Sequence, residues 1–230
     1  MIKVWRNNWY WFGGILFIAL SFFMGFWGTH LLSHIQVIMV FSFMAMLVHQ
    51  VEEYGWPGGF PSITNIIHFR ETEIPDRYPF NPNLCFFDNV FTTYTFYIVP
   101  IFFPNLIWLA LAQTLAALLQ LPAHGIFMNM RLKSIYNPGL GATVFLQLPL
   151  AIYMIYYVTT NGLASGWDFV FGAIGGIVGY ALCFGLPVLL MRNRNSKYSF
   201  TERQMFGFAE KKARKILEDA NSKLFQSNKK

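Results

Sequence analysis

The hydrophobic positions of this chain fall into six long runs that are almost free of charge and are separated by polar connections. About twenty apolar residues are enough to cross a hydrocarbon core of about 30 Å as a helix. We therefore predict an all-α, polytopic membrane bundle of about six helices. The runs cover residues 9–28, 30–51, 88–103, 106–130, 140–160 and 167–191.

The composition supports a membrane protein. Hydrophobic residues make up 55% of the chain and charged residues only 12%, whereas charged residues are about a quarter of a soluble domain. The first run lacks the short apolar core and small-residue cleavage site of a secretory signal, so we expect it to be retained. Cys85 and Cys183 are far apart in sequence, and we expect both to be free thiols.

The placement of positive charge predicts the orientation. Of the seventeen Lys and Arg residues, eleven follow Met191. If the N-terminus is cytoplasmic, all seventeen lie on the cytoplasmic side and the external connections hold none, as the positive-inside bias requires. We therefore expect both termini to be cytoplasmic and the protein to be multi-pass in the cell (inner) membrane. A basic tail beside a membrane also argues against a nucleic-acid partner.

The chain is predicted to have two parts, a helix bundle over 1–191 and a basic cytoplasmic tail over 192–230. Ser199 and Glu202 have the spacing of a capping box. A helical apolar stripe follows, beside several lysines, which is typical of an amphipathic helix on an anionic membrane face. An oligomer contact or a solvated helix is the alternative. The stripe consists of Met205, Ala209, Ala213, Ile216, Ala220 and Leu224.

Four glycines in the sixth run form two interleaved pairs with the small-xxx-small spacing. Such pairs let helix backbones approach closely in lipid, so we expect a packing role rather than a pore. They are Gly172, Gly175, Gly176 and Gly179.

The candidate chemistry lies at the end of the second run. In a helix, His49, Glu52 and Glu53 are at i, i+3 and i+4 and share one face. Ionisable groups inside a membrane are costly and usually functional. His124, near the end of the fourth run, lies at a similar depth when both are counted at 1.5 Å per residue. We expect these residues to meet near the cytoplasmic face.

This residue set suits a divalent metal. His49, His124 and Glu52 or Glu53 could bind zinc, and the other glutamate, with Glu53 preferred, could be the general base. A dinuclear iron or manganese centre would need additional ligands, for which the candidates are His68, Glu71, Glu73 and Asp88. The alternatives remain open: a hydrogen-bonded pair at a helix end, solvated side chains in the long polar connection over 54–85, and Asp88 as the cap of a third helix that it opens.

The segment His49-Gln50-Val51-Glu52-Glu53, followed by Trp56-Pro57-Gly58-Gly59-Phe60-Pro61, resembles the HXXEE family of bacterial and archaeal membrane proteins. Over 69–73 an Ala-Arg-x-x-Glu element carries Phe in place of Ala, which implies that Glu73 is the loop carboxylate of interest. In the family an asparagine lies four residues before a histidine, and in this chain Gln120 occupies that position before His124. The family also has a basic residue before a Pro-Gly turn, which corresponds here to Arg131 or Lys133 before Pro138-Gly139. The resemblance covers about 27–160. It implies a membrane location and a shared polar site, but no reaction.

Three functions are compatible with the sequence. The first is a metal-dependent membrane enzyme, a hydrolase or an oxidoreductase, that acts on a lipid or another hydrophobic small molecule from the bilayer. The second is a transporter or small-ligand carrier that uses the His and Glu cluster as a proton or cation site. The third is a scaffold in which the cluster holds helices together. Bound metal would distinguish the first from the others.

Overall fold

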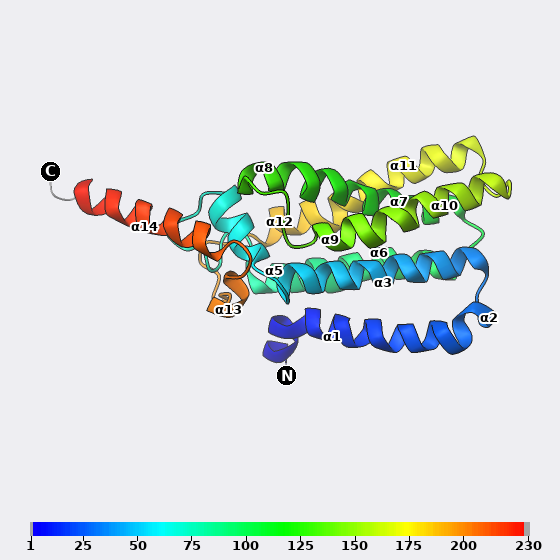
Figure 1. The fold of residues 1–230 in the computed structure, drawn as a ribbon, viewed down its shortest axis with the longest axis horizontal. Coiled ribbons are helices and arrows are strands. Elements are labelled where there is room, and N and C mark those ends of the chain that lie inside the picture. The colour runs from blue at the N-terminus through cyan, green and yellow to red at the C-terminus, as the bar shows by residue number, and fades with distance from the viewer. Residues whose placement is uncertain (1, 228–230) are drawn as a thin grey trace.

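The computed structural model describes residues 2–227, and the regular structure of the described part is all helical, without strands (Figure 1). Six of its helices are long and apolar enough to cross a membrane. This confirms the prediction of a polytopic helix bundle. The six spans are Lys3–Leu31, His34–Tyr54, Pro82–Phe102, Ile107–Leu132, Leu140–Thr160 and Gly166–Met191.

Most spans are built from α-helical pieces joined by wider helical turns. The pieces are α1 (Ile2–Phe23) and α2 (Thr29–Leu31); α3 (His34–Tyr54); α5 (Pro82–Phe86) and α6 (Thr93–Ile98); α7 (Ile107–Gln120) and α8 (Asn129–Leu132); α9 (Leu140–Ala142) and α10 (Leu148–Thr160); and α11 (Gly166–Tyr180) and α12 (Leu186–Met191). The π-helical turns between them cover Met24–Gly28, Phe87–Thr92, Leu121–Met128, Thr143–Gln147 and Ala181–Gly185, and a 3-10 turn, Val99–Phe102, ends the third span.

Prolines accompany several of these wider turns. Pro122 lies inside one, and Pro149 and Pro187 lie two residues after the ends of two others. Because proline lacks a backbone donor and clashes with the preceding turn, the helical hydrogen bonds shift around it. Such turns are often found at functional sites, and one of them carries His124.

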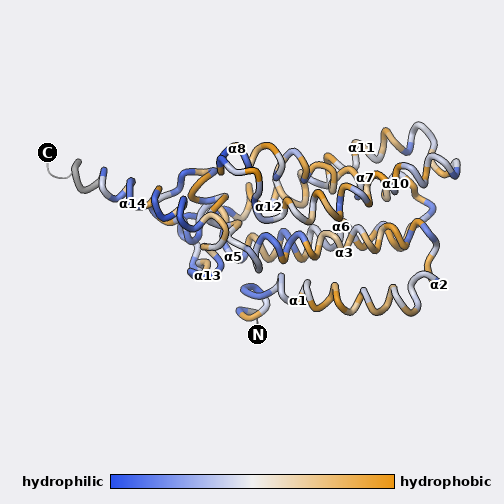
Figure 2. The backbone as a smooth tube through the Cα atoms, viewed as in Figure 1, coloured by the Kyte–Doolittle hydropathy of each residue, from blue (hydrophilic) through white to orange (hydrophobic). Residues whose placement is uncertain are grey.

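The polar end of the bundle is at the left in Figure 1. The first turns of α1, the tail helices and the two connections over 55–81 and 133–139 lie toward this end. Figure 2 shows hydrophilic residues concentrated at this end and apolar residues along the rods. The predicted positive segments therefore share one end, while its assignment to the cytoplasm remains a prediction from the charge bias.

The second span is the centre of the bundle. In its most apolar stretch 67% of the residues are buried, against 17% for the first and sixth spans. It begins at His34, where Ser33 and Gln36 form a capping box, and ends at Tyr54. Both glutamates of the candidate site are therefore inside the helix rather than beyond it.

The third span begins at Pro82, earlier than predicted. The side chain of Asn81 accepts hydrogen bonds from the backbone N–H groups of Asn83 and Leu84 at 3.1 and 3.0 Å. Asn81 is thus the cap, with Pro82 in the first helical position. The prediction that Asp88 opens and caps this helix is wrong, because Asp88 lies within it, in the turn Phe87–Thr92.

The connection between the second and third spans is not a solvated loop. It folds back against the bundle through α4 (Phe60–Ser62) and the π-helical turn Ile63–His68. The side chain of Asn65 holds it by donating to the carbonyls of Pro75 and Phe80 and accepting from the N–H of Phe80. Its apolar residues form a buried core with those of the third span: Phe60, Ile63, Ile66, Ile67, Phe80, Leu84 and Cys85.

The tail packs on this same core. It contains α13 (Glu202–Met205) and α14 (Glu210–Ser227), and Thr201 with Gln204 forms the capping box, not Ser199 with Glu202. The first part of the predicted stripe packs on the protein's own chain: Met205, Ala209 and Ala213 are buried and Ile216 packs against them. Ala220 is half-buried, and the side chain of Leu224 lies outside the described residues.

The glycines of the sixth span make close helix contacts, in agreement with the prediction. A Cβ on Gly172 would lie 2.6 Å from Cβ of Leu111, and one on Gly176 would lie 2.8 Å from Cβ of Leu115. Gly179 meets the ring of Phe96 on the third span. The sixth span therefore fits closely against the third and fourth, which with the second enclose the candidate site.

Candidate metal centre

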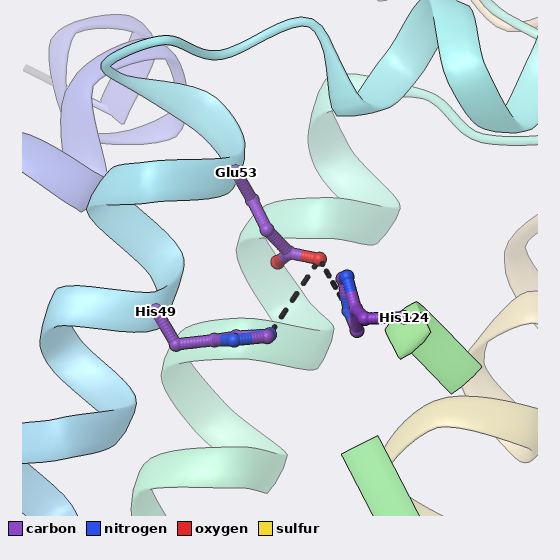
Figure 3. Close-up of side chains that lie close together, drawn as sticks. All are labelled: His49, Glu53 and His124. Atoms are coloured by element: carbon purple, nitrogen blue, oxygen red, sulfur yellow. Dashed lines mark ion pairs between the residues drawn. The ribbon is translucent and has the colours of Figure 1, made fainter. Parts of the chain in front are cut away.

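Three buried ionisable side chains meet at the polar end of the bundle. His49 and Glu53 project from the same face of α3, and His124 projects from the turn Leu121–Met128 of the fourth span (Figure 3). Nε2 of His49 lies 3.6 Å from Oε1 of Glu53, and Nε2 of His124 lies 3.4 Å from the same oxygen. The two imidazole rings are nearly perpendicular, at 83°, with centroids 4.8 Å apart.

The outer nitrogen of each ring is held by an oxygen. Nδ1 of His49 lies 2.9 Å from the backbone carbonyl of Gly139, and Nδ1 of His124 lies 2.7 Å from Oδ1 of Asn137. The amide nitrogen of Asn137 donates to the carbonyl of His124 and to Oδ1 of Asn129, both at 2.7 Å, so its oxygen faces the ring. Both Nδ1 atoms therefore donate, which leaves each neutral ring with its lone pair on Nε2, toward Glu53.

The backbone of Gly139 passes close to both rings. Its φ is +98°, and a Cβ there would lie 2.5 Å from Cε1 of His124 and 2.8 Å from Cε1 of His49. Any side chain would displace the rings, and the left-handed backbone itself favours glycine. The Pro138-Gly139 step thus supports both histidines and is more than a connection.

Two of the three separations between ligand atoms fit a tetrahedral metal ion, and all three atoms lie within 4.8 Å of one another. Metal–ligand bonds of about 2.0 to 2.1 Å in a tetrahedron place neighbouring ligand atoms about 3.3 to 3.4 Å apart. The separations of 3.4 and 3.6 Å are close to this edge length and long for hydrogen bonds. The acceptor on each Nδ1 is also the usual outer partner of a metal-bound histidine. The three side chains could therefore hold one metal ion.

Glu52, predicted as a ligand, points elsewhere. Its carboxylate accepts hydrogen bonds from the backbone N–H groups of Gly141 and Ala142 at 3.0 and 2.7 Å and from the hydroxyl of Tyr136 at 2.7 Å. It thus caps the N-terminus of the fifth span, where a negative charge is favoured. Within the described residues, the group that could hold a metal consists of His49, Glu53 and His124.

Asp88 shares the cavity beside this group. The cavity has a volume of about 80 Å³ and is lined by all three side chains of the group as well as by Asp88. Asp88 is 6% exposed, and its carboxylate has no hydrogen-bond partner within the described part of the chain. The buried hydroxyl of Tyr97 also lacks a partner there, and Tyr97 lines the same cavity. Two polar groups are therefore available to a bound molecule.

The remaining predicted residues lie away from the centre. His68 lies largely at the surface, and the partial burial of its ring together with the nearby charge of Arg131 lowers its pKa. Glu71 and Glu73 both pair with Arg194 of the tail. The loop residues thus do not complete a dinuclear set, because the connection that carries them is fastened to the tail.

Sequence reasoning missed the residues that orient the rings. Asn137 directly precedes Pro138-Gly139, so the only signal was an Asn in a segment interpreted as a turn. The hydroxyl of Thr143 lies 3.3 Å from Nδ1 of His49, and the ring of Phe60 stacks near that of His124 at 6.4 Å between centroids. Their contacts depend on how separate spans pack, and no local pattern marks them.

Comparison with known proteins gives one match. A family model described as a protein of unknown function with an HXXEE motif matches residues 40–154. The match includes the three-residue group together with Glu52, Asp88 and Asn137, and it excludes the first span and the tail. None of the curated proteins or solved structures compared with the chain matches it.

Proposed function

The chain belongs to the HXXEE family, and we propose that it is a membrane-embedded, metal-dependent hydrolase that acts on a hydrophobic substrate. One observation carries the proposal: two histidines with anchored Nδ1 atoms direct Nε2 at one oxygen of Glu53. Three protein ligands with a remaining open position are typical of catalytic zinc sites. In this assignment Glu53 is a ligand rather than the general base.

The cavity supplies the other groups that a hydrolysis needs. A bound divalent metal would polarise a carbonyl and acidify a water molecule. Asp88 accepts a proton from the attacking water and returns it to the leaving group, since it lines the cavity and its carboxylate has no competing partner within the described residues. The Tyr97 hydroxyl donates to the substrate oxygen. Glu52 keeps the supporting turn in place and does not touch the reacting atoms.

The position of the cavity supports a hydrophobic substrate. The spans that build it are apolar, and its lining includes Met46, Phe96, Met128 and Phe184. Apolar side chains bind an acyl or prenyl group by removing it from water. Because the site lies at the polar end of the bundle, a molecule with an apolar chain and a polar scissile group, such as a lipid, would match it.

Metal content tests the proposal first. We expect detergent-purified protein to contain about one divalent ion per chain, and His49→Ala and His124→Ala to lose it. His34→Ala is a matched control, because His34 lies at the other end of the same helix and contacts Tyr153 at 2.8 Å. Loss of metal from His34→Ala as well, or no metal in the parent protein, would contradict the proposal.

A second measurement separates the enzyme from the alternatives. Asp88→Asn is expected to retain the metal while abolishing hydrolysis of long-chain acyl esters or amides presented in micelles. A protein without metal that shows pH-dependent flux in vesicles would instead be a carrier. Absence of both metal and flux, with reduced stability in Glu53→Gln, would indicate a scaffold.

A further inference from the structure

Four positive side chains meet at the polar end of the bundle, outside the metal centre. Arg131 and Lys133 end the fourth span, Arg70 follows the turn Ile63–His68, and Lys212 belongs to α14. The turn Ile63–His68 packs against both α8 and α14, which brings the three segments together. Lys212 Nζ donates to the carbonyls of Arg131 and Leu132 at 2.9 and 2.8 Å. We call these four residues the basic cluster.

The basic cluster is not neutralised by the protein. Three arginines outside the cluster have close carboxylates: Arg77 pairs with Asp76, Arg194 with Glu71, and Arg214 with Glu202. Within the described residues, no member of the basic cluster has a carboxylate within ion-pair distance. Burial lowers the pKa of Lys212, and the nearby charges of Lys133 and Arg70 lower it further. An anion bound there would relieve this repulsion.

Backbone geometry distinguishes two members of the basic cluster. Arg70 and Lys133 have φ of 58° and 49°, and they are the non-glycine residues with positive φ in the described part of the chain. This conformation is unfavourable for L residues with long side chains and persists where the surrounding structure imposes it. Two such residues in one cluster indicate that the positions of these charges are determined by the fold.

A shallow, open groove, mainly apolar, continues from the basic cluster along the end of the fourth span. It is lined by Ile126, Met130 and Ile135 together with Lys133 and Ser134. Met130 is 71% exposed and Ile135 is 95% exposed. These residues flank the end of a candidate membrane span, so in a bilayer the cluster would lie at headgroup level and the groove beside acyl chains.

We propose that the basic cluster and this groove form a binding site for an anionic phospholipid. Arg70, Lys133 and Lys212 bind the phosphate, and one acyl chain lies along Ile126 and Met130. Basic sites at the ends of membrane helices recognise lipid headgroups through this charge complementarity. The site joins the connection over 55–81, the fourth span and the tail, so the bound lipid holds these three segments together at the polar end. It does not depend on the metal centre.

Lipid binding in nanodiscs tests the proposal. Phosphatidylglycerol bound to the full-length protein is measured by native mass spectrometry, in discs that otherwise contain phosphatidylcholine. The variant Arg70→Asn/Lys133→Asn removes two charges, and Asn tolerates a left-handed backbone. We expect its affinity for phosphatidylglycerol to fall about thirtyfold, from about 1 kcal/mol per charge. The matched control Lys211→Asn/Lys215→Asn removes two exposed charges from α14.

The outcomes are distinct. An affinity unchanged in the control and reduced in the cluster variant supports the site. Equal reduction in both variants would overturn it, because it would indicate only a general attraction between charges. Inorganic phosphate is the second probe: tight phosphate binding in pure phosphatidylcholine discs, without preference for phosphatidylglycerol, would overturn the lipid assignment. Equal melting temperatures of the two variants would establish that the reduced affinity for phosphatidylglycerol is not caused by misfolding.

Discussion

The side chain of Asn137 holds the imidazole of His124 in place. Its Oδ1 accepts from Nδ1 of the ring at 2.7 Å, and its Nδ2 donates to the backbone carbonyl of the same histidine at 2.7 Å. The residue is fully buried, at 0% exposure. One amide therefore determines both the tautomer and the direction of the ring, and Nε2 is left for Glu53.

Asn137→Ala is predicted to weaken metal binding without removing a ligand. Loss of an outer partner of a metal-bound histidine typically costs 10- to 100-fold in affinity, and we expect an effect in this range. Competition with a coloured chelator measures it in detergent. Asn137→Asp keeps the acceptor and should lie between the parent protein and the alanine variant. Unaltered affinity in Asn137→Ala would show that the ring needs no such support.

The two adjacent glutamates should respond differently to the same substitution. Glu53→Gln is expected to abolish stoichiometric metal, because it replaces the carboxylate on which both histidines converge. Glu52→Gln should retain the metal but lower the free energy of unfolding by about 1.5 to 3 kcal/mol, since it weakens charge-assisted hydrogen bonds to Gly141 and Ala142. Metal analysis and thermal unfolding together test this. The reverse pattern would make Glu52 the ligand.

Gly139→Ala should disrupt the centre through sterics. The new Cβ would lie 2.5 Å from Cε1 of His124, so we expect loss of metal together with about 1 to 3 kcal/mol of destabilisation. Gly162→Ala provides the control: its φ is also positive, at +61°, but nothing lies within 4 Å of its Cβ. That variant should carry only backbone strain and keep its metal. Full metal occupancy in Gly139→Ala would contradict the close approach.

The stability of the contact between the connection over 55–81 and the tail should depend on pH. Burial raises the pKa of Glu71, but hydrogen bonds from the N–H groups of Glu73 and Ile74 and from Arg194 outweigh it, so the pKa lies below the usual 4.5. A carboxyl with a depressed pKa stabilises the fold above pH 4.5, and this contribution is lost as the pH falls through the folded-state pKa.

We therefore expect Glu71→Gln to lower the melting temperature at pH 6 and to have progressively less effect below pH 4.5. The loss at pH 6 should be about 1 to 2 kcal/mol, reduced by solvent screening because Arg194 is half-exposed. Glu73→Gln is the control, since the side chain of Glu73 is 75% exposed and pairs with the same arginine. Equal effects of the two variants would show that burial of Glu71 is unimportant.

The sequence alone was sufficient for the fold class and the number of spans. The run over 140–160 was predicted with the bounds that the structure has, because apolar length and charge asymmetry are local properties that a bilayer demands of any helix crossing it. The predicted starts of the second and third spans were less accurate. The capping residues Ser33 and Asn81 determine where these helices begin, and hydrophobicity alone does not mark such residues.

The sequence also showed that His49, Glu52, Glu53 and His124 belong to one polar layer, because depth follows from helical rise. It could not decide which glutamate faces His124. The two lie about 100° apart around one helix, and the choice depends on where the turn before the fifth span packs: its N–H groups take Glu52 and leave Glu53 to the histidines. Only tertiary structure decides such directions, because they result from contacts between residues about 90 positions apart in the chain.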